Sequence, residues 1–402
     1  VAVTSRLSQR APSHPNGPIA MNCVLRIRAG GRATGLAGKC GTAPCGPNAG
    51  WGVVLALALA LGQAVHAEEP RVVATPGGLK PFLARSDARG VIHLVAQGPA
   101  GPRYCQSRDG GASFSEPVAI VSGGDFPAGL EFEVWDVAVS PAGDVHVALG
   151  TNAWKLKRPH SEWGLYYTRQ PAHAERFEPV RNINTRPSEG FALAVGPQGR
   201  VTATWLADRL YANVSTDGGD TFGPIVEFDP TADPCNCCTT TAAYGADGRL
   251  AVLYREETNN DRDMHVVLWD QAGERVTRRA VSRKGWKVDA CPMTYFSLVA
   301  DGEGYLAAWP TRGELQFTRL NADGEPTQRM ETSTGGQTGM LTGVLGPPGP
   351  DGSQLLVWKK EGTLHWQTFD RGFRPVGKAQ HVASPGAGAA GVRTDRGLVL
   401  FR

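Results

Sequence analysis

The chain has 402 residues, of which 41 are Lys or Arg, 38 are Asp or Glu, and 41 % are hydrophobic. Its 51 Gly and 29 Pro make up about a fifth of the chain, below the roughly 25–30 % of disordered proteins, so disordered and collagen-like classes are excluded. The formal net charge of +3 arises in residues 1–67, which hold basic but no acidic residues. Without them the chain is slightly acidic, so we expect neither nucleic acid nor an anionic membrane as a partner.

Residues 53–61 form an apolar run that follows several arginines and precedes Val65-His66-Ala67. This order of basic, apolar and small residues is typical of a secretory signal peptide, and we expect cleavage after Ala67. A membrane anchor is the alternative, but the run is shorter than the ~20 residues that span a bilayer. The sequence therefore predicts a signal peptide with an over-long start in residues 1–67. Residues 68–402 are expected to form a single periplasmic or secreted domain.

A turn with Gly, followed by a short apolar alternating run, recurs seven times between residues 86 and 402. Since the repeats are 45 to 56 residues apart and no long segment has a helical period, the sequence predicts an all-β repeat architecture. A propeller closes its sheets into a ring, whereas a two-sheet sandwich, the alternative, has no reason to repeat seven times. We expect a six- or seven-bladed β-propeller. The strand count favours seven, with residues 71–75 joining the last strands so that both termini close the final blade. The anchoring glycines are Gly90, Gly143, Gly199, Gly248, Gly304, Gly352 and Gly397.

Two octads follow the third strand of their repeats, SRDGGASF at residues 107–114 and STDGGDTF at 215–222. The Asp can accept hydrogen bonds from the backbone of a tight turn and the glycines allow positive φ, so we expect a structural role. The octads resemble the Asp-box, or bacterial neuraminidase repeat, of the sialidase superfamily. With Cys235-Asn236-Cys237-Cys238 and residues 285–292, they make the chain similar to exported bacterial proteins known as exo-α-sialidases or glycosyl hydrolases. With strands A to D counted outwards, the resemblance implies that D–A and B–C loops share one face.

The residues that the resemblance implies for sialidase chemistry are incomplete. Lys80 stands where the family has the first arginine of an F/Y-R-I-P motif, and the loop at residues 97–104 has no acid. Lys lacks the planar geometry with which Arg binds a carboxylate. We therefore expect the standard sialidase mechanism to be absent. The alternative is an active exo-α-sialidase or glycoside hydrolase with a rearranged site. Its acid would come from Glu256, Glu257, Asp263 or Glu189, and its nucleophile would be Tyr254 or Tyr295.

Cations follow the second strand of consecutive repeats at similar offsets. If loops share one face, they gather at one mouth and attract a carboxylate, sulfate or phosphate. The alternative is that they pair with neighbouring acids such as Glu256. An insertion at residues 152–163 adds Trp154 and Trp163 beside cations, which suits stacking on sugar rings. The sequence therefore predicts recognition of an anionic or glycan ligand on the loop face, without a cofactor. The four cations are Arg209, Arg255, Arg312 and Lys359.

Export makes the cysteines after residue 67 disulfide candidates. Cys238 and Cys291 both precede the innermost strand of adjacent repeats, so a Cys238–Cys291 or Cys237–Cys291 disulfide is predicted. The alternative is a copper or zinc site made of Cys235, Cys237, Cys238 and Cys291, although C-x-C-C is not the usual zinc spacing. Cys105 is expected to be buried or alone. A third functional class is therefore a protein-interaction scaffold whose cysteines hold a metal or redox centre.

Overall fold

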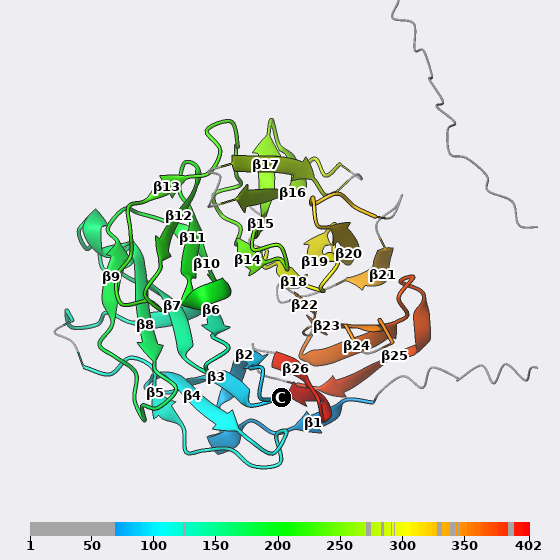
Figure 1. The fold of residues 1–402 in the computed structure, drawn as a ribbon, viewed down its shortest axis with the longest axis horizontal. Coiled ribbons are helices and arrows are strands. Elements are labelled where there is room, and N and C mark those ends of the chain that lie inside the picture. The colour runs from blue at the N-terminus through cyan, green and yellow to red at the C-terminus, as the bar shows by residue number, and fades with distance from the viewer. Residues whose placement is uncertain are drawn as a thin grey trace, which may run out of the picture. The chain divides into compact units, whose positions relative to one another are not determined.

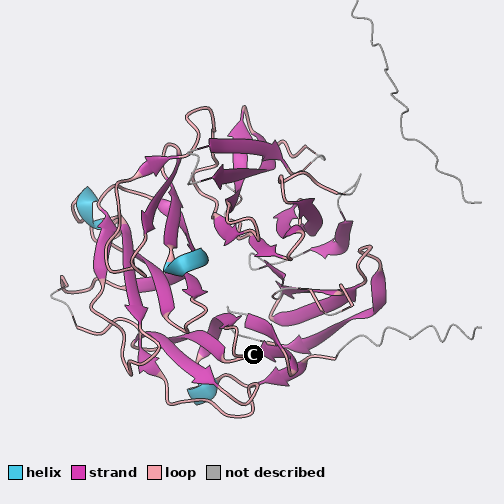
Figure 2. Cartoon of the chain, viewed as in Figure 1, coloured by secondary structure: helices cyan, strands magenta, loops and turns pink. Residues whose placement is uncertain are grey.

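The computed structural model of the chain describes residues 69–402 with several gaps. Within this part, seven small sheets are arranged in a ring as the blades of a propeller (Figure 1). Strands and loops make up nearly all of it, with three short 3-10 turns (Figure 2). The predicted all-β propeller is confirmed, and of the two blade numbers left open the structure has seven. The gaps are residues 124–125, 271–274, 283–284, 291, 293, 328–331, 338–341, 345, 347, 350 and 385–389.

Six blades have four strands each, and the first strand of each blade in sequence is the innermost. The strands of blades 1 to 3 are β2 Lys80–Ser86, β3 Ile92–Gly98, β4 Gly101–Ser107, β5 Val118–Ala119, β6 Phe132–Val139, β7 Val145–Thr151, β8 Leu165–Gln170, β9 Arg181–Asn184, β10 Glu189–Val195, β11 Val201–Leu206, β12 Leu210–Ser215 and β13 Val226–Glu227. The strands of blades 4 to 6 are β14 Thr241–Tyr244, β15 Leu250–Thr258, β16 Asp261–Asp270, β17 Arg275–Ala280, β18 Ser297–Ala300, β19 Gly304–Thr311, β20 Glu314–Asn321, β21 Thr332–Gln337, β22 Thr342–Val344, β23 Gln354–Lys360, β24 Thr363–Phe369 and β25 Pro375–Ala383. The 3-10 turns are η1 Pro76–Gly78, η2 His160–Glu162 and η3 Pro197–Gly199.

Both termini of the described chain build the seventh blade. β26 (Ala390–Thr394) and β27 (Gly397–Phe401) form an antiparallel pair, and β1 (Arg71–Val73) adds to β27 in parallel as the outer strand. This is the closure predicted for residues 71–75. Pairing the two ends in one sheet closes the ring, so that a loss of this blade would expose sheet faces on both neighbours.

The second strand of each blade is the most deeply buried. All eight residues of β19 are buried, and Trp205 on β11 and Trp309 on β19 are at most 1 % exposed. These strands are covered on both faces because each sheet packs between two others, and the hydrophobic clusters combine residues of adjacent blades. A charged side chain on such a strand is therefore forced into a blade interface unless it lies at the strand end.

The two octads form the tight turns that their sequence predicts. In the first, the Asp109 carboxylate accepts hydrogen bonds from the backbone N–H of Ser113 at 2.9 Å and from Ser107 Oγ at 2.8 Å. Asp217 makes the same contacts with Thr221 and Ser215, at 2.9 and 2.6 Å. Both carboxylates are occupied by their own turns, which supports the structural role expected of them.

Candidate functional site

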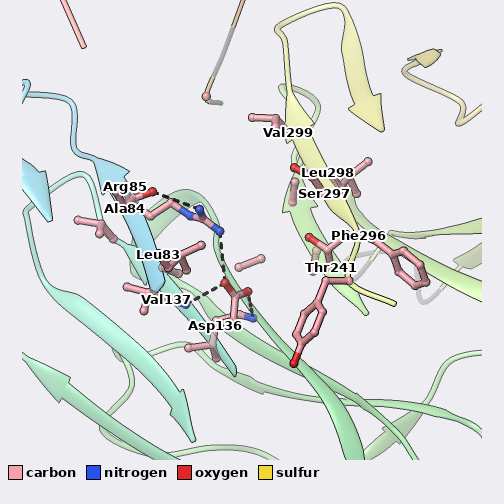
Figure 3. A pocket seen from close by; sticks show the side chains of 18 of the residues that line it. Leu83, Ala84, Arg85, Asp136, Val137, Thr241, Phe296, Ser297, Leu298 and Val299 are labelled. Carbon is pink, nitrogen blue, oxygen red and sulfur yellow. Dashed lines mark hydrogen bonds and ion pairs between the residues drawn. The ribbon is translucent and has the colours of Figure 1, made fainter. Parts of the chain in front are cut away.

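The inner strands enclose a cavity of about 470 Å³ along the centre of the ring. Its wall is made by β2, β6, β10, β14, β18 and β26 and is mostly small and apolar. Figure 3 shows Arg85 and Asp136 on one side of this cavity and Thr241, Ser297 and Val299 on the other. The channel is therefore a preformed hollow with one charged pair on its wall.

Asp136 ties the first three blades together at the channel wall. Its carboxylate accepts hydrogen bonds from the backbone N–H of Leu193 at 2.9 Å and of Val137 at 2.8 Å. Arg85 donates to it at 3.3 Å. Burial raises the pKa of Asp136, and the charge of Arg85 opposes that rise. Because the Arg85 side chain is 45 % exposed, solvent screens this ion pair, and its main effect is to hold the wall in place.

Aromatic side chains from three blades meet towards the end of the channel where the inner strands begin. The Trp135 ring lies 5.3 Å from Phe191, edge to face, and 6.5 Å from Tyr295. Gly150 on β7 allows this position of the indole, because a Cβ there would collide with it. The indole Nε1 is buried and has no hydrogen-bond partner within the described chain.

Two exposed carboxylates stand beside these rings, Glu133 on β6 and Glu189 at the start of β10. Desolvation by the surrounding protein, and then the charge of Glu133, raise the pKa of Glu189, although part of its side chain remains exposed. The same two causes raise the pKa of Tyr295. Glu133 thus lies within electrostatic reach of both groups. We call Glu133, Trp135, Glu189, Phe191 and Tyr295 the channel mouth.

Hydrogen bonds between blades 3, 4 and 5 position the channel mouth. The N–H and Oγ1 of Thr240 donate to the carbonyl oxygen of Gly190 at 3.1 and 2.5 Å. Those of Thr239 donate to Thr294 at 3.2 and 3.1 Å. Gly190 has a φ of +67°, and a Cβ there would collide with the carbonyl of Cys238, so only glycine fits. Since Gly190 follows the mouth glutamate of β10 and Thr294 precedes the mouth tyrosine, these bonds fix the backbone of both.

Two of the four predicted ligand-binding cations, Arg255 and Lys359, are buried, which corrects the prediction that they face a ligand on the loop surface. Arg255 donates to the carbonyl oxygens of Arg262 at 3.1 Å and Pro310 at 2.7 Å. Burial lowers the pKa of Lys359. Both residues lie within long strands, β15 and β23, so their side chains follow the strand alternation into the interior.

The other predicted binding residues lie nearer the surface. Arg312 is exposed and donates to Gly285 at 2.5 Å, and Arg209 is half-buried and donates to its neighbour's carbonyl at 3.1 Å. Trp154 is 59 % exposed, whereas Trp163 is half-buried and donates to a carbonyl of its own loop at 3.0 Å. None of these four residues lines the central cavity.

The predicted catalytic residues Tyr254, Glu256 and Asp263 already have partners. Tyr254 is fully buried and donates to Glu256 at 2.6 Å, and Glu256 also accepts from Arg278 at 2.9 Å. Asp263 accepts from Ser282 at 2.8 Å. Burial, and then the hydrogen bond with Glu256, raise the pKa of Tyr254. A buried, protonated and paired phenol is a poor nucleophile, so this arrangement argues against these roles.

The sulfur atoms of Cys235, Cys237 and Cys238 lie within 4.8 Å of one another, a grouping that could hold a metal ion. Cys235 and Cys238 carry free thiols, as does the buried Cys105. A free Cys238 rules out the Cys238–Cys291 disulfide. Cys291 lies outside the described residues, so its pairing with Cys237, and its place as a fourth metal ligand, stay predictions.

Two of the five residues of the channel mouth were predicted from the sequence. Glu189 and Tyr295 were candidates for a rearranged hydrolase site, but Glu133, Trp135 and Phe191 were missed. All five lie at or near the entry to an inner strand. Counting residues from the start of the first strand of each repeat, instead of from the end of the second, would have found them.

No family model and no curated protein sequence matches this chain. Solved structures do resemble it. A protein from Lactobacillus plantarum is 15 % identical over 80 % of this chain and 87 % of its own, with a TM-score of 0.48. A leech intramolecular trans-sialidase complexed with 2,7-anhydro-Neu5Ac is 11 % identical over 76 % and 68 %, with a TM-score of 0.46. A mutant Aleuria aurantia lectin in complex with α-methyl-L-fucoside is 12 % identical over 77 % and 96 %, with a TM-score of 0.45.

No helix in the described part of the chain is both long and apolar enough to cross a bilayer.

Proposed function

We propose that this protein binds a carbohydrate at the channel mouth. The observation that carries the proposal is the meeting of Trp135, Phe191 and Tyr295 beside Glu133 and Glu189, at one end of a preformed cavity. The partly exposed rings of Trp135 and Tyr295 offer flat apolar faces for a sugar ring, and the buried Phe191 packs against Trp135. Carboxylates accept hydrogen bonds from sugar hydroxyls. A few polar groups around an apolar hollow are what a small-molecule site requires.

The charge of the channel mouth favours a neutral sugar over an anionic one. Glu133 and Glu189 would repel a carboxylate or sulfate held beside the three rings. Arg85 lines the cavity but is paired with Asp136, and none of the four cations predicted for such a ligand lines it. We therefore narrow the anionic or glycan ligand expected from the sequence to a neutral glycan.

We further propose that the chain is an exported member of the sialidase superfamily. The two octads, their hydrogen-bonded turns and the blade spacing support the superfamily. The apolar run at residues 53–61 supports export to the periplasm or beyond the cell.

Binding is tested on a glycan array with the full chain and the variant Trp135→Ala. Loss of the indole removes the central ring of the mouth, and we expect affinity for any bound glycan to fall at least tenfold, about 1.4 kcal/mol. Trp154→Ala is the matched control, because Trp154 is exposed and lies outside the cavity. Equal affinity of wild type and Trp135→Ala would overturn the proposal, as would loss of binding in Trp154→Ala alone.

A second candidate function is glycoside hydrolysis at the same mouth, favoured by the raised pKa of Glu189 next to Glu133. A carboxyl with a raised pKa near a second carboxyl is the pairing that glycosidases use as acid and base or nucleophile. Turnover of a glycan found on the array, abolished in Glu189→Gln without loss of binding, is the expected result for an enzyme. Binding without turnover leaves the protein a lectin.

A further inference from the structure

The segment between β13 and β14 brings three sulfur atoms together. Cys235 Sγ lies 3.4 Å from Cys237 Sγ and 3.4 Å from Cys238 Sγ. A turn closed by the Cys238 N–H and the Cys235 carbonyl at 3.0 Å holds the outer two in this register. Cys235 and Cys238, free thiols that are 2 % and 1 % exposed, form a C-x-x-C pair. Their sulfurs need to approach by little more than 1 Å to reach bonding distance.

Two buried guanidinium groups flank this pair. Arg262 Nη1 donates to Cys235 Sγ at 2.7 Å. Arg255 lies between the rings of Trp286 and Phe296, with its guanidinium carbon 4.9 and 5.4 Å from their centroids. The other hydrogen bonds of both arginines go to backbone carbonyls. The cysteine sulfur is therefore the group beside them that can carry a negative charge, and the two guanidinium charges favour a thiolate in the pair.

A hydrogen bond links the two thiols, with Cys238 Sγ donating to Cys235 Sγ at 3.4 Å. Cys235 Sγ also accepts from Arg262. Two hydrogen-bonded thiols beside guanidinium groups favour one thiolate next to one protonated thiol, the arrangement that lets a dithiol attack a disulfide and then resolve the intermediate.

We propose that Cys235 and Cys238 form a reversible dithiol–disulfide centre, oxidised by small disulfides of the glutathione class. The thiolate of the pair attacks one sulfur of the oxidant, whose S–S bond breaks and releases one thiolate. The remaining thiol then loses its proton and attacks the protein sulfur of the mixed disulfide, which expels the second thiolate and forms the Cys235–Cys238 bond. Two electrons pass to the oxidant, and its two thiolates take up the proton of the pair and one proton from water.

A metal site fits the same residues less well. Cys237 has an interaction partner of its own, which leaves two thiols rather than three for a cation. Arg255 and Arg262 would also repel a cation placed between the sulfurs. Metal binding is therefore the competing outcome of the test.

The centre adjoins the proposed carbohydrate site but does not depend on it. Cys238 is followed directly by Thr239 and Thr240, whose hydrogen bonds position the channel mouth. Moving Cys238 towards Cys235 would pull on this segment. The redox state of the pair can therefore alter the mouth, whatever ligand the mouth takes.

The test equilibrates the full chain with reduced and oxidised glutathione at a series of ratios. Samples are quenched in acid, unfolded in guanidinium chloride and alkylated, so that burial does not hide a thiol. Tryptic cleavage after Arg209 and Arg249 leaves Cys235, Cys237 and Cys238 on one peptide, together with any peptide bonded to Cys237, and fragmentation reads each cysteine. We expect Cys235 and Cys238 to escape alkylation together at oxidising ratios, which leaves the peptide two hydrogen atoms lighter than its unalkylated dithiol form. With excess reduced glutathione, both should be alkylated again.

The controls separate this centre from other thiol chemistry. Cys105→Ser removes a buried thiol in blade 1 and should leave the paired transition unchanged, while Cys235→Ser should abolish it. Cys235 and Cys238 fully alkylated at every glutathione ratio would overturn the proposal. So would stoichiometric copper or zinc in the purified wild-type protein, released together with the appearance of both thiols. Both results are read on the wild type and do not require any variant to fold.

Discussion

The channel mouth and the interface between blades 4 and 5 treat charge in opposite ways. At the mouth, Glu133 and Glu189 are exposed beside aromatic rings and remain available to a ligand. In the interface, Arg255 and Arg262 are buried against sulfur and carbonyl oxygens. Charged residues of the same propeller thus serve either ligand recognition or internal chemistry. The role of each residue depends on the face of the sheet on which its side chain lies, rather than on the sign of its charge.

Neighbours on β15 show how sharply this division falls. Arg255 points towards blade 5, where it bonds to Pro310, and Glu256 points to the other face, where it bonds to Tyr254 and Arg278. A one-residue shift along a strand reverses the face. Similar offsets in different blades therefore do not guarantee equal environments: Arg255 lies within β15 and is buried, whereas Arg209 lies after β11 and is half-buried.

The largest expected effect is a difference in protein stability between a buried and a half-buried arginine variant. Arg255→Ala leaves two carbonyl oxygens and a thiolate without their donor in a buried interface, so we expect a loss of at least ~3 kcal/mol in the free energy of unfolding. Arg209→Ala, in the loop that follows β11 one blade earlier, should change it by less than ~0.5 kcal/mol. Guanidinium chloride denaturation measures both. Similar losses in the two variants would show that Arg255 contributes no more to stability than Arg209.

A pH dependence of stability is the next effect in size. Because the pKa of folded Cys238 lies below the ordinary value of 9.0, its contribution is complete above pH 9 and is lost as pH falls through the lowered pKa. Between these limits, the free energy of unfolding of the reduced protein should rise by up to about 1.4 kcal/mol for each unit by which the pH increases. Cys238→Ser should remove this slope.

Cys105→Ser is the control for that slope. Burial raises the pKa of Cys105 to about 12, so its own contribution is intact below pH 9 and is lost only at higher pH. Denaturation of both variants in reducing buffer between pH 6 and 9 compares them. A slope that persists in Cys238→Ser would place the titrating group elsewhere.

The repeat, its closure by residues 71–75 and the octad turns could be predicted from the sequence, because each depends on a local pattern, either a Gly turn or a period of about 50 residues. The channel mouth could not. Trp135 and Tyr295 lie in blades 2 and 5 and meet only because the ring closes. The burial of Arg255 depends on which face of β15 its side chain lies on and on the blade that packs against that face. Neither this burial nor the meeting of the mouth residues can be predicted from the sequence of a single repeat.

The smallest expected effect tests whether the cations predicted from the sequence or the channel mouth binds the ligand. Arg209→Ala and Arg312→Ala, combined in one chain, remove two side chains that donate to nearby carbonyls outside the cavity. We expect affinity for a neutral glycan to stay within about twofold of wild type, since neither group reaches the mouth. Isothermal titration calorimetry with the glycan selected on the array measures this. A tenfold loss, or a preference for sulfated or sialylated glycans that disappears in the double variant, would return the binding site to the cationic loops.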